Sequence, residues 1–232
     1  AGSVQQSGHL IATNTHGVGG NITMIGDQIG LLSGSDINAS GANGGGAVLI
    51  GGNERGQGPL NNASAVYMDS AATINTNATA QGHGGQVVLW SDDYTAFYGS
   101  INSQGGPQGG NGGQVETSSH NNLQAMGNVN ASAPFGVAGT WLLDPADVTI
   151  NNTGATSNVV STVGPIFTSS GNDAVINVSS IVNALNIGSN VGINSSSGTG
   201  SGTGNIYIQN TIAANNSTST VLSFNATGGI II

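Results

Sequence analysis

The residues most able to bind a metal ion are two pairs of aspartates. Asp92 and Asp93 are adjacent, and Asp144 and Asp147 lie on either side of Pro145. Carboxylate oxygens are the ligands that Ca²⁺ prefers, but adjacent residues of a strand point to opposite faces, so Asp92 and Asp93 cannot easily share one ion. The alternative is that these carboxylates accept hydrogen bonds from backbone amides in turns. We therefore expect no metal site.

The histidines and hydroxyl residues show no catalytic spacing. His9, His16, His83 and His120 do not have the separation of zinc ligands, and no serine lies in the GxSxG pattern of a nucleophile elbow. A polysaccharide lyase needs a basic proton acceptor, and Arg55 is the only Lys or Arg. A hydrolase that uses two aspartates remains an alternative. We expect no cofactor and no enzymatic activity.

Four aromatic residues lie close together at Trp90, Tyr94, Phe97 and Tyr98. They could form a strip on which sugar rings stack. Strand alternation would place Tyr94 and Tyr98 on one face and Phe97 on the other. The simpler interpretation is an aromatic stack within or beside the core, and we expect Trp141 to lie in the core as well.

Composition excludes several classes of partner. The formal net charge is −9, with one Lys or Arg and ten Asp or Glu, so the surface cannot neutralise phosphates and nucleic-acid binding is excluded. An anionic membrane surface would repel the chain, and no apolar run approaches the roughly 20 residues of a membrane-spanning helix. The chain has no cysteine, so its stability must come from its backbone ladder and core.

Short strand patterns recur along the chain. Four begin with a Gly-Gly pair, at 19–26, 44–52, 84–90 and 112–117, and between them lie triplets with one aliphatic residue, at 36–38, 73–75, 100–102 and 128–130. Glycine permits sharp turns between such strands. One coil of a solenoid buries too little apolar surface alone, whereas stacked coils share a core. The sequence therefore predicts an all-β fold, a parallel β-helix with coils of roughly 20–30 residues.

Two irregularities interrupt this repeat. The wide gap before residue 84 predicts an inserted loop at 53–60, which carries Arg55, and the pattern at 179–187 predicts one short helix capped by Ser179 or Ser180. After Asn151 no Gly-Gly pair occurs until Gly228. We therefore expect β-helix coils with Gly-rich turns over 1–150. Residues 151–232 would be either a continuation of the solenoid or a second β-rich module, in a fragment of a longer chain.

Five segments resemble the large exoproteins of the filamentous-haemagglutinin type, the passengers of two-partner secretion in Gram-negative bacteria. Four follow one another in the family's order, and the fifth resembles the segment that often comes next. They are GGGAVLIGGNERGQG (44–58), GHGGQVVLWSDDYTAFYGSINSQGG (82–106), GNGGQVETSS (110–119), GTWLLDPADVTI (139–150) and SSIVNALNIGSNVGI (179–193).

The resemblance implies a right-handed parallel β-helix (β-solenoid) in the shaft of a secreted fibre at the bacterial cell surface, acting in adhesion or biofilm formation. It also implies export through an outer-membrane two-partner-secretion transporter. The ligand on a host or matrix surface is not implied. A self-assembling extracellular filament subunit, in which copies stack end to end, is the alternative within the same architecture. A β-helical enzyme acting on polysaccharides is the third interpretation.

Some adhesins of this type carry sugars on asparagine, and eleven asparagines here lie in Asn-x-Ser/Thr sequons. We expect the subset that faces solvent to be modified, although turn chemistry and chance account for many of the matches. An intact mass equal to that of the bare 22.7 kDa chain would contradict this expectation. The sequons begin at Asn21, Asn38, Asn62, Asn77, Asn130, Asn151, Asn177, Asn194, Asn215, Asn216 and Asn225.

Overall fold

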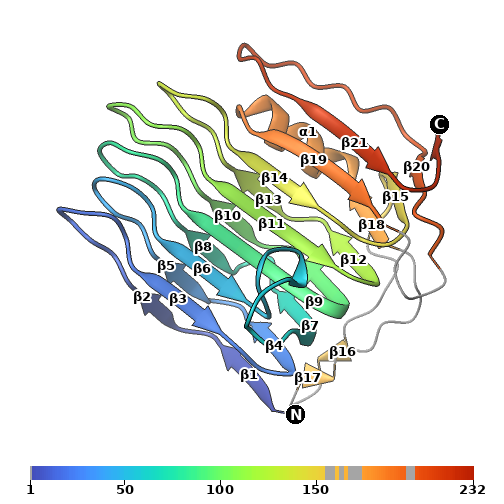
Figure 1. Cartoon of the computed structure of the whole chain (residues 1–232), viewed down its shortest axis with the longest axis horizontal. Coiled ribbons are helices and arrows are strands. Elements are labelled where there is room, and N and C mark those ends of the chain that lie inside the picture. Colours follow the sequence, from blue (N-terminus) through green and yellow to red (C-terminus); the bar gives the residue numbers. More distant parts are fainter. Residues whose placement is uncertain (1, 155–159, 162–164, 167–173, 197–201) are drawn as a thin grey trace.

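A computed structural model describes residues 2–154, 160–161, 165–166, 174–196 and 202–232. Nearly all regular structure in these residues is β-strand, and the strands pair in parallel. Among the described strands, only the two-residue pair β16 (Val160–Ser161) and β17 (Pro165–Ile166) is antiparallel. The predicted all-β class with parallel strands is confirmed, and Figure 1 shows the strands lying side by side in one long stack.

The paired strands form three columns, which we call A, B and C. Column A consists of β3 (Asn21–Met24), β6 (Ala47–Ile50), residues 86–91 of β9 (Gln86–Phe97), β11 (Gln114–Ser119), β14 (Thr140–Leu143), β19 (Asn190–Ser195) and β21 (Leu222–Ala226). Column B consists of β1 (Ser3–Gln6), β4 (Gln28–Leu31), β7 (Ala63–Met68), residues 94–97 of β9, β12 (Asn122–Ala125), β18 (Ala174–Asn177), β15 (Val148–Asn151), β20 (Ile206–Ile208) and β22 (Ile230–Ile231). Column C consists of β2 (His9–Ile11), β5 (Asp36–Asn38), β8 (Thr73–Asn75), β10 (Ser100–Asn102) and β13 (Asn128–Asn130).

Through the first half of the chain, consecutive strands enter columns B, C and A in turn, and each such set of three forms one level of the stack. The levels pair in register, which places similar side chains directly above one another. In column C the central residues are Ile37, Ile74, Ile101 and Val129. These four side chains are at most 1% exposed, so one aliphatic residue per level is enough to fill this side of the core.

The inward positions follow strand alternation. The sequence predicts eleven of them, and ten lie in the main hydrophobic core; Ile22 is only partly buried and packs against that core. The predicted residues are Ile22, Met24, Val48, Ile50, Val66, Met68, Val87, Leu89, Ile101, Val115 and Val129.

The polar run at 91–93 predicts a break between two strands, and this prediction is wrong, because β9 continues through all three residues. Its first half pairs with β11 in column A and its second half with β12 in column B, and the register against β7 shifts between Ala63 and Ala65. The neighbouring strands therefore keep the backbone extended while it turns from one column to the next. The two aspartates lie at this bend.

The predicted helix is confirmed to within one residue as α1 (Val178–Asn186). Its N-cap is Asn177 instead of the expected Ser179 or Ser180, and the Asn177 side chain accepts a hydrogen bond from the Ser179 amide. The helix packs against β13, the last strand of column C, where Asn183 Nδ2 donates to Asn128 Oδ1 at 3.2 Å. Figure 1 shows α1 behind β19.

After Asn151 the order of the strands departs from the order of the chain. β18 comes later in the sequence than β15, yet it lies between β12 and β15 and pairs with both. β19 and β21 continue column A, and β20 and β22 continue column B. The sequence predicts strands at 174–178, 192–194, 205–209, 219–225 and 229–232, and all five are present, with bounds that differ by at most three residues.

The predicted insertion is also present. Strand β6 ends at Ile50 and β7 begins at Ala63, and the loop between them contains the 3₁₀ turn η1 (Glu54–Gly56). In Figure 1 this loop crosses the outer face of the strands of column A. The backbone N–H of Arg55 in this loop donates to Glu116 of β11. Strand β11 lies two strands further along column A than β6.

The Gly-Gly pairs close each level between columns C and A. The second glycine of a pair donates its N–H to the carbonyl of the residue that follows the short strand of the same level. Gly46 donates to Ala39 at 2.8 Å and Gly85 donates to Thr76 at 2.8 Å. Gly20, Gly113 and Gly139 make the equivalent bonds to Ala12, Ser103 and Ala131.

Neighbouring levels leave no room for a side chain at these pairs. A Cβ on Gly45 would lie 1.9 Å from the carbonyl oxygen of Thr76 in the next level, and a Cβ on Gly85 would lie 2.0 Å from the carbonyl oxygen of Gly46 in the level before. The same overlap recurs at Gly84, Gly112 and Gly113, within 2.1 Å of a backbone oxygen. These contacts are backbone against backbone, so only glycine fits.

Gly85→Ala therefore tests the packing of this corner. We expect a loss of about 3 kcal/mol or more in the free energy of unfolding, measured by urea denaturation, because the methyl group overlaps fixed backbone on the neighbouring level. Gly8→Ala is the matched control, since a Cβ there meets nothing within 4 Å, and its effect should stay within about 0.5 kcal/mol. Equal losses in the two variants would contradict this account.

Candidate functional site

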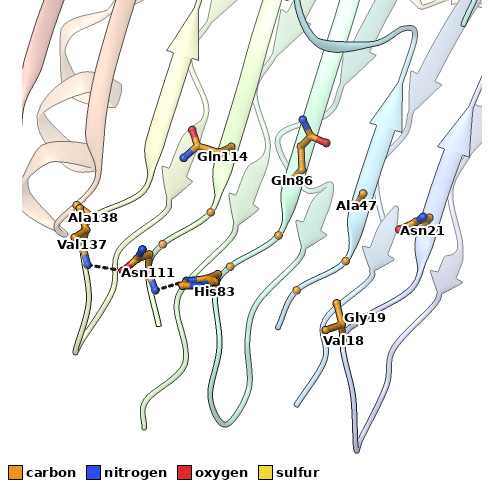
Figure 2. Close-up of a pocket in the computed structure, with 16 residues that line it drawn as sticks. Val18, Gly19, Asn21, Ala47, His83, Gln86, Asn111, Gln114, Val137 and Ala138 are labelled. Atoms are coloured by element: carbon orange, nitrogen blue, oxygen red, sulfur yellow. Dashed lines mark hydrogen bonds between the residues drawn. The ribbon is translucent and has the colours of Figure 1, made fainter. Parts of the chain in front are cut away.

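A groove of about 630 Å³ runs along the stack beside the glycine pairs. Figure 2 shows that it crosses several consecutive strands of column A where each strand begins. Glycine pairs form much of its lining, so the backbone itself makes up the floor of the groove. The side chains and backbone that line it come from Val18, Gly19, Asn21, Gly45, Gly46, Ala47, His83, Gly84, Gly85, Gln86, Asn111, Gly112, Gly113, Gln114, Val137 and Ala138.

One wall of the groove is a column of register partners. Asn21 pairs with Ala47, Ala47 with Gln86, and Gln86 with Gln114. Because these residues start successive strands, their side chains repeat at the strand spacing of about 4.8 Å. Figure 2 shows the amide groups of Gln86 and Gln114 on adjacent strands. The wall therefore presents side-chain amides at Asn21, Gln86 and Gln114, with Ala47 interrupting the row.

The opposite wall is held by hydrogen bonds between levels. The backbone N–H of Asn111 donates to His83 Nδ1 at 2.9 Å, and the N–H of Val137 donates to Asn111 Oδ1 at 3.0 Å. Since Nδ1 is an acceptor here, the proton of the neutral His83 ring lies on Nε2. These bonds fix the wall and leave one imidazole N–H as a donor.

The lining contains no Asp, Glu, Lys or Arg. Gln86 Nε2 lies 3.5 Å from a carboxylate oxygen of Glu54 outside the lining, at the limit of a hydrogen bond. The lining also lacks a nucleophile held by a general base, which covalent catalysis needs. The groups that the groove offers to a ligand are therefore neutral hydrogen-bond donors and acceptors.

A second polar cluster lies on the outer face of column A, under the inserted loop. Glu116 is only 3% exposed, and both of its carboxylate oxygens accept a hydrogen bond from the backbone N–H of Arg55, at 3.0 and 3.2 Å. Arg55 itself has φ 55°, in the left-handed region where non-glycine residues are uncommon. The buried carboxylate thus anchors the loop at its most constrained residue.

Trp90 forms the surface on which this loop rests. A Cβ on Gly56 would lie 2.5 Å from the indole ring, so the loop approaches Trp90 closely enough to require glycine. Trp90 is 7% exposed, and its Nε1 donates to Asp92 Oδ1 at 3.4 Å. Asn62 of the same loop donates to the same oxygen at 2.9 Å. A single carboxylate oxygen of Asp92 therefore accepts hydrogen bonds from both the Trp90 ring and the loop residue Asn62.

Burial governs the electrostatics of this cluster. Desolvation raises the pKa of Glu116 to about 7, an increase that the nearby Glu54 and Asp144 carboxylates reinforce and the bonds from Arg55 and Ser118 oppose. Desolvation also raises the pKa of Asp144, while the Arg55 charge and a bond from Asn194 hold it down. Sequence reasoning missed Glu116, because its burial is created by a loop about sixty residues earlier in the chain.

The predicted acidic pairs do not converge. Asp93 accepts a hydrogen bond from Asn121 at 3.2 Å, whereas Asp92 bonds to the inserted loop. Asp147 accepts the backbone N–H groups of Thr203 at 3.0 Å and Asn205 at 2.7 Å, which is the turn role considered for it. In the part of the chain that the structure describes, no group of three or more His, Cys, Asp or Glu side chains could hold a metal ion.

The histidines lie apart from one another. His83 lines the groove, His9 Nδ1 lies 3.1 Å from Asp36 Oδ2, and His16 Nδ1 contacts the Thr15 hydroxyl at 2.9 Å. His120 follows β11 and is partly buried. Of these four residues, His83 alone is placed where it could meet a ligand of the groove.

Trp90, Tyr94 and Phe97 are buried and Tyr98 is partly buried, so these four residues form no exposed stacking strip. Phe97 lies in the main core against Trp141, with ring centroids 6.0 Å apart in an edge-to-face arrangement. Tyr94 belongs to a smaller cluster against which Tyr67 and Tyr98 pack. The expected separation of Tyr94 and Tyr98 from Phe97 is therefore observed. Desolvation raises the pKa of Tyr94 and that of Tyr98.

Much of the sequon pattern follows from turn chemistry. In four sequons the asparagine Oδ1 accepts the backbone N–H of the Ser or Thr two residues later, which is an Asx turn. These are Asn38, Asn130, Asn151 and Asn177. Of the other seven sequon asparagines, three are exposed, namely Asn21, Asn215 and Asn225, and four are partly buried, namely Asn62, Asn77, Asn194 and Asn216. Glycosylation itself stays a prediction, and we expect it at the exposed asparagines Asn21, Asn215 and Asn225.

No protein-family model matches this chain, and no curated protein matches its sequence significantly. The family resemblance described above therefore stays a proposal. None of the described helices is both long and apolar enough to cross a membrane.

Glu116→Gln tests the electrostatic origin of the loop anchor. The Glu116 pKa is about 7 in the folded protein against an ordinary value of 4.5, so the folded state binds the proton more tightly. The stabilisation is fully present below pH 4.5 and is lost as the pH rises through 7, by at most about 3 kcal/mol. We expect Glu116→Gln to remove this slope from urea unfolding curves and to be more stable than the wild type at pH 8.

Glu54→Gln is the matched control, because it removes an exposed carboxylate from the same loop and should leave most of the slope in place. The raised pKa of Asp144 adds a pH dependence of the same sign to the stability of every variant. The test is therefore the difference in slope between each variant and the wild type. A Glu116→Gln protein that keeps the full slope, or is less stable than the wild type at pH 8, would refute the assignment.

Proposed function

We propose that the chain is a right-handed parallel β-helix and forms part of the shaft of a secreted bacterial surface fibre of the filamentous-haemagglutinin type. The observation that carries this proposal is the in-register parallel pairing of successive levels in three columns. The proposed right-handed winding agrees with the strong preference of parallel crossover connections for that hand. A stack whose levels are closed by backbone contacts at glycine pairs is suited to a stiff spacer.

The surface of this stack supports an attachment role better than a catalytic one. Its groove is open, neutral and extended along the stack. We propose that the fibre acts in adhesion or biofilm formation at the bacterial cell surface, after export through an outer-membrane two-partner-secretion transporter. The ordered set of segments from residue 44 to 193 supports both the secretion route and the extracellular location.

A self-assembling filament is the second candidate, and the C-terminal end of the stack favours it. Among the described strands, β22 pairs only with β20, and Ile230, Ile231 and Ile232 are 48%, 45% and 95% exposed. An apolar open strand edge invites further strand pairing. Such an edge would accept either more of the same solenoid or another copy of it.

A polysaccharide-active enzyme is a weaker third candidate. Two carboxyl groups with raised pKa, Glu116 and Asp144, lie near the inserted loop, and such groups are candidates for acid–base catalysis. Glu116, however, is buried and already bound to Arg55, so a substrate does not reach it in this arrangement. A shaft should release no sugar from acidic or neutral polysaccharides.

Immunogold electron microscopy of the source bacterium tests the shaft proposal. Antibodies raised against the purified chain should label fibres on intact, unpermeabilised cells, and their Fab fragments should reduce surface attachment or biofilm mass severalfold. Serum absorbed with the purified chain is the control. Label confined to the cell interior would contradict the proposal.

A further inference from the structure

The groove continues beyond the residues drawn as sticks in Figure 2. A second hollow of about 630 Å³ shares Val137 and Ala138 with the first and extends to Ile187, Asn190 and Val221. Together the two hollows follow column A from the residues before β3 to the residues before β21. This distance covers seven strands of the column, each about 4.8 Å from the next. The result is one long channel for an extended ligand.

The two walls of this channel differ in chemistry. One side, which also carries His83 and Asn111, includes three apolar side chains that are largely open to solvent: Val18, Val137 and Ile187 are 56%, 68% and 47% exposed. On the other side, the amides of Asn21 and Gln114 bond to no other side chain or backbone group among the described residues, and Gln86 makes only the long contact to Glu54. A ligand must therefore offer both C–H surface and hydrogen-bonding groups.

The charge of the protein excludes ionic ligands from this site. The chain carries a formal net charge of −9, which repels sulfated or carboxylated polymers. Arg55, the sole strongly basic residue, lies in the inserted loop, and neither hollow includes it in its lining. A cationic ligand also finds no carboxylate in either lining. The remaining class is a neutral polymer.

An extended peptide fits this channel less well than a sugar chain. Peptides that add to a sheet need unpaired backbone groups, whereas the glycine N–H groups of this corner already donate to Ala39, Thr76 and Ser103. The groups left unpaired are side-chain amides and the Nε2–H of His83. Hydroxyl groups satisfy such donors and acceptors, and the C–H faces of sugar rings suit the apolar wall.

We propose that the channel binds a neutral polysaccharide chain that lies along the stack, with about one sugar ring per level. This inference rests on the attachment role proposed above and names its ligand class. Gln86 and Gln114 bond the hydroxyls of successive sugars, while Val18 and Val137 contact ring C–H groups. Binding is additive over levels, so affinity rises with the length of the sugar chain until the channel is filled.

Affinity electrophoresis of the purified chain tests this site. Native gels would contain mixed-linkage β-glucan, galactomannan or dextran as neutral polymers, and polygalacturonate or heparin as anionic ones. We expect retardation by at least one neutral polymer and none by the anionic polymers. The double variant Gln86→Ala, Gln114→Ala should bind at least tenfold more weakly, and its thermal unfolding should match that of the wild type.

Gln5→Ala is the matched control, because Gln5 is an exposed strand glutamine in column B, outside the linings of both hollows. If the double variant does not fold, Val137→Asp replaces it, since Val137 is 68% exposed and the added carboxylate would disrupt the apolar wall. The proposal is overturned if no neutral polymer retards the protein or if an anionic polymer retards it more. Equal retardation of the folded groove variants and the wild type would also overturn it.

These outcomes are distinguishable from a failure of the shaft proposal. The gels use the isolated chain and do not depend on where the protein is located in the cell. Surface labelling without sugar binding would support the shaft proposal and contradict only the proposed ligand class. Sugar binding without surface labelling would support the binding channel and contradict the shaft proposal.

Discussion

The backbone contact at the Gly-Gly pairs is the constraint on which the rest of this structure depends. At Gly45 and Gly85 the neighbouring levels approach so closely that a Cβ would lie within about 2 Å of a carbonyl oxygen. This contact sets the separation of columns C and A, and it allows one isoleucine or valine per level to fill that part of the core. The same glycine pairs line the groove. Packing and the candidate binding surface therefore share these residues.

In-register stacking also explains why the chain carries so little charge. Like charges on directly opposed strand positions repel each other, so a repeated acidic or basic position would accumulate unfavourable energy at every level. The column Asn38, Asn75, Asn102 and Asn130 uses amides instead, and Asn102 Nδ2 donates to Asn75 Oδ1 at 3.0 Å. The groove is lined by neutral side chains for the same reason. The low charge of the chain and the neutral ligand class proposed for the groove are therefore connected.

Local patterns in the sequence predict the repeated parts of the fold and not its exceptions. The triplets around Ile37, Ile74 and Ile101 combine strand propensity with turn residues, and α1 has its own apolar face, so both are visible without tertiary information. The placement of β18 between β12 and β15 depends on pairing between distant segments. The burial of Glu116 depends on a loop that folds back over β11. The groove depends on the register that aligns Asn21, Gln86 and Gln114, which no single segment encodes.

Distances between spin labels in column C test the stacked arrangement most directly. The chain has no cysteine, so nitroxide labels can be placed on paired substitutions of Thr73, Ser100 and Asn128, which are register partners. The account predicts that Thr73–Ser100 and Ser100–Asn128 each span one strand spacing of about 4.8 Å and Thr73–Asn128 two, plus a constant contribution from the label. Distances that follow sequence separation instead of level number, or broad distributions for all three pairs, would contradict it.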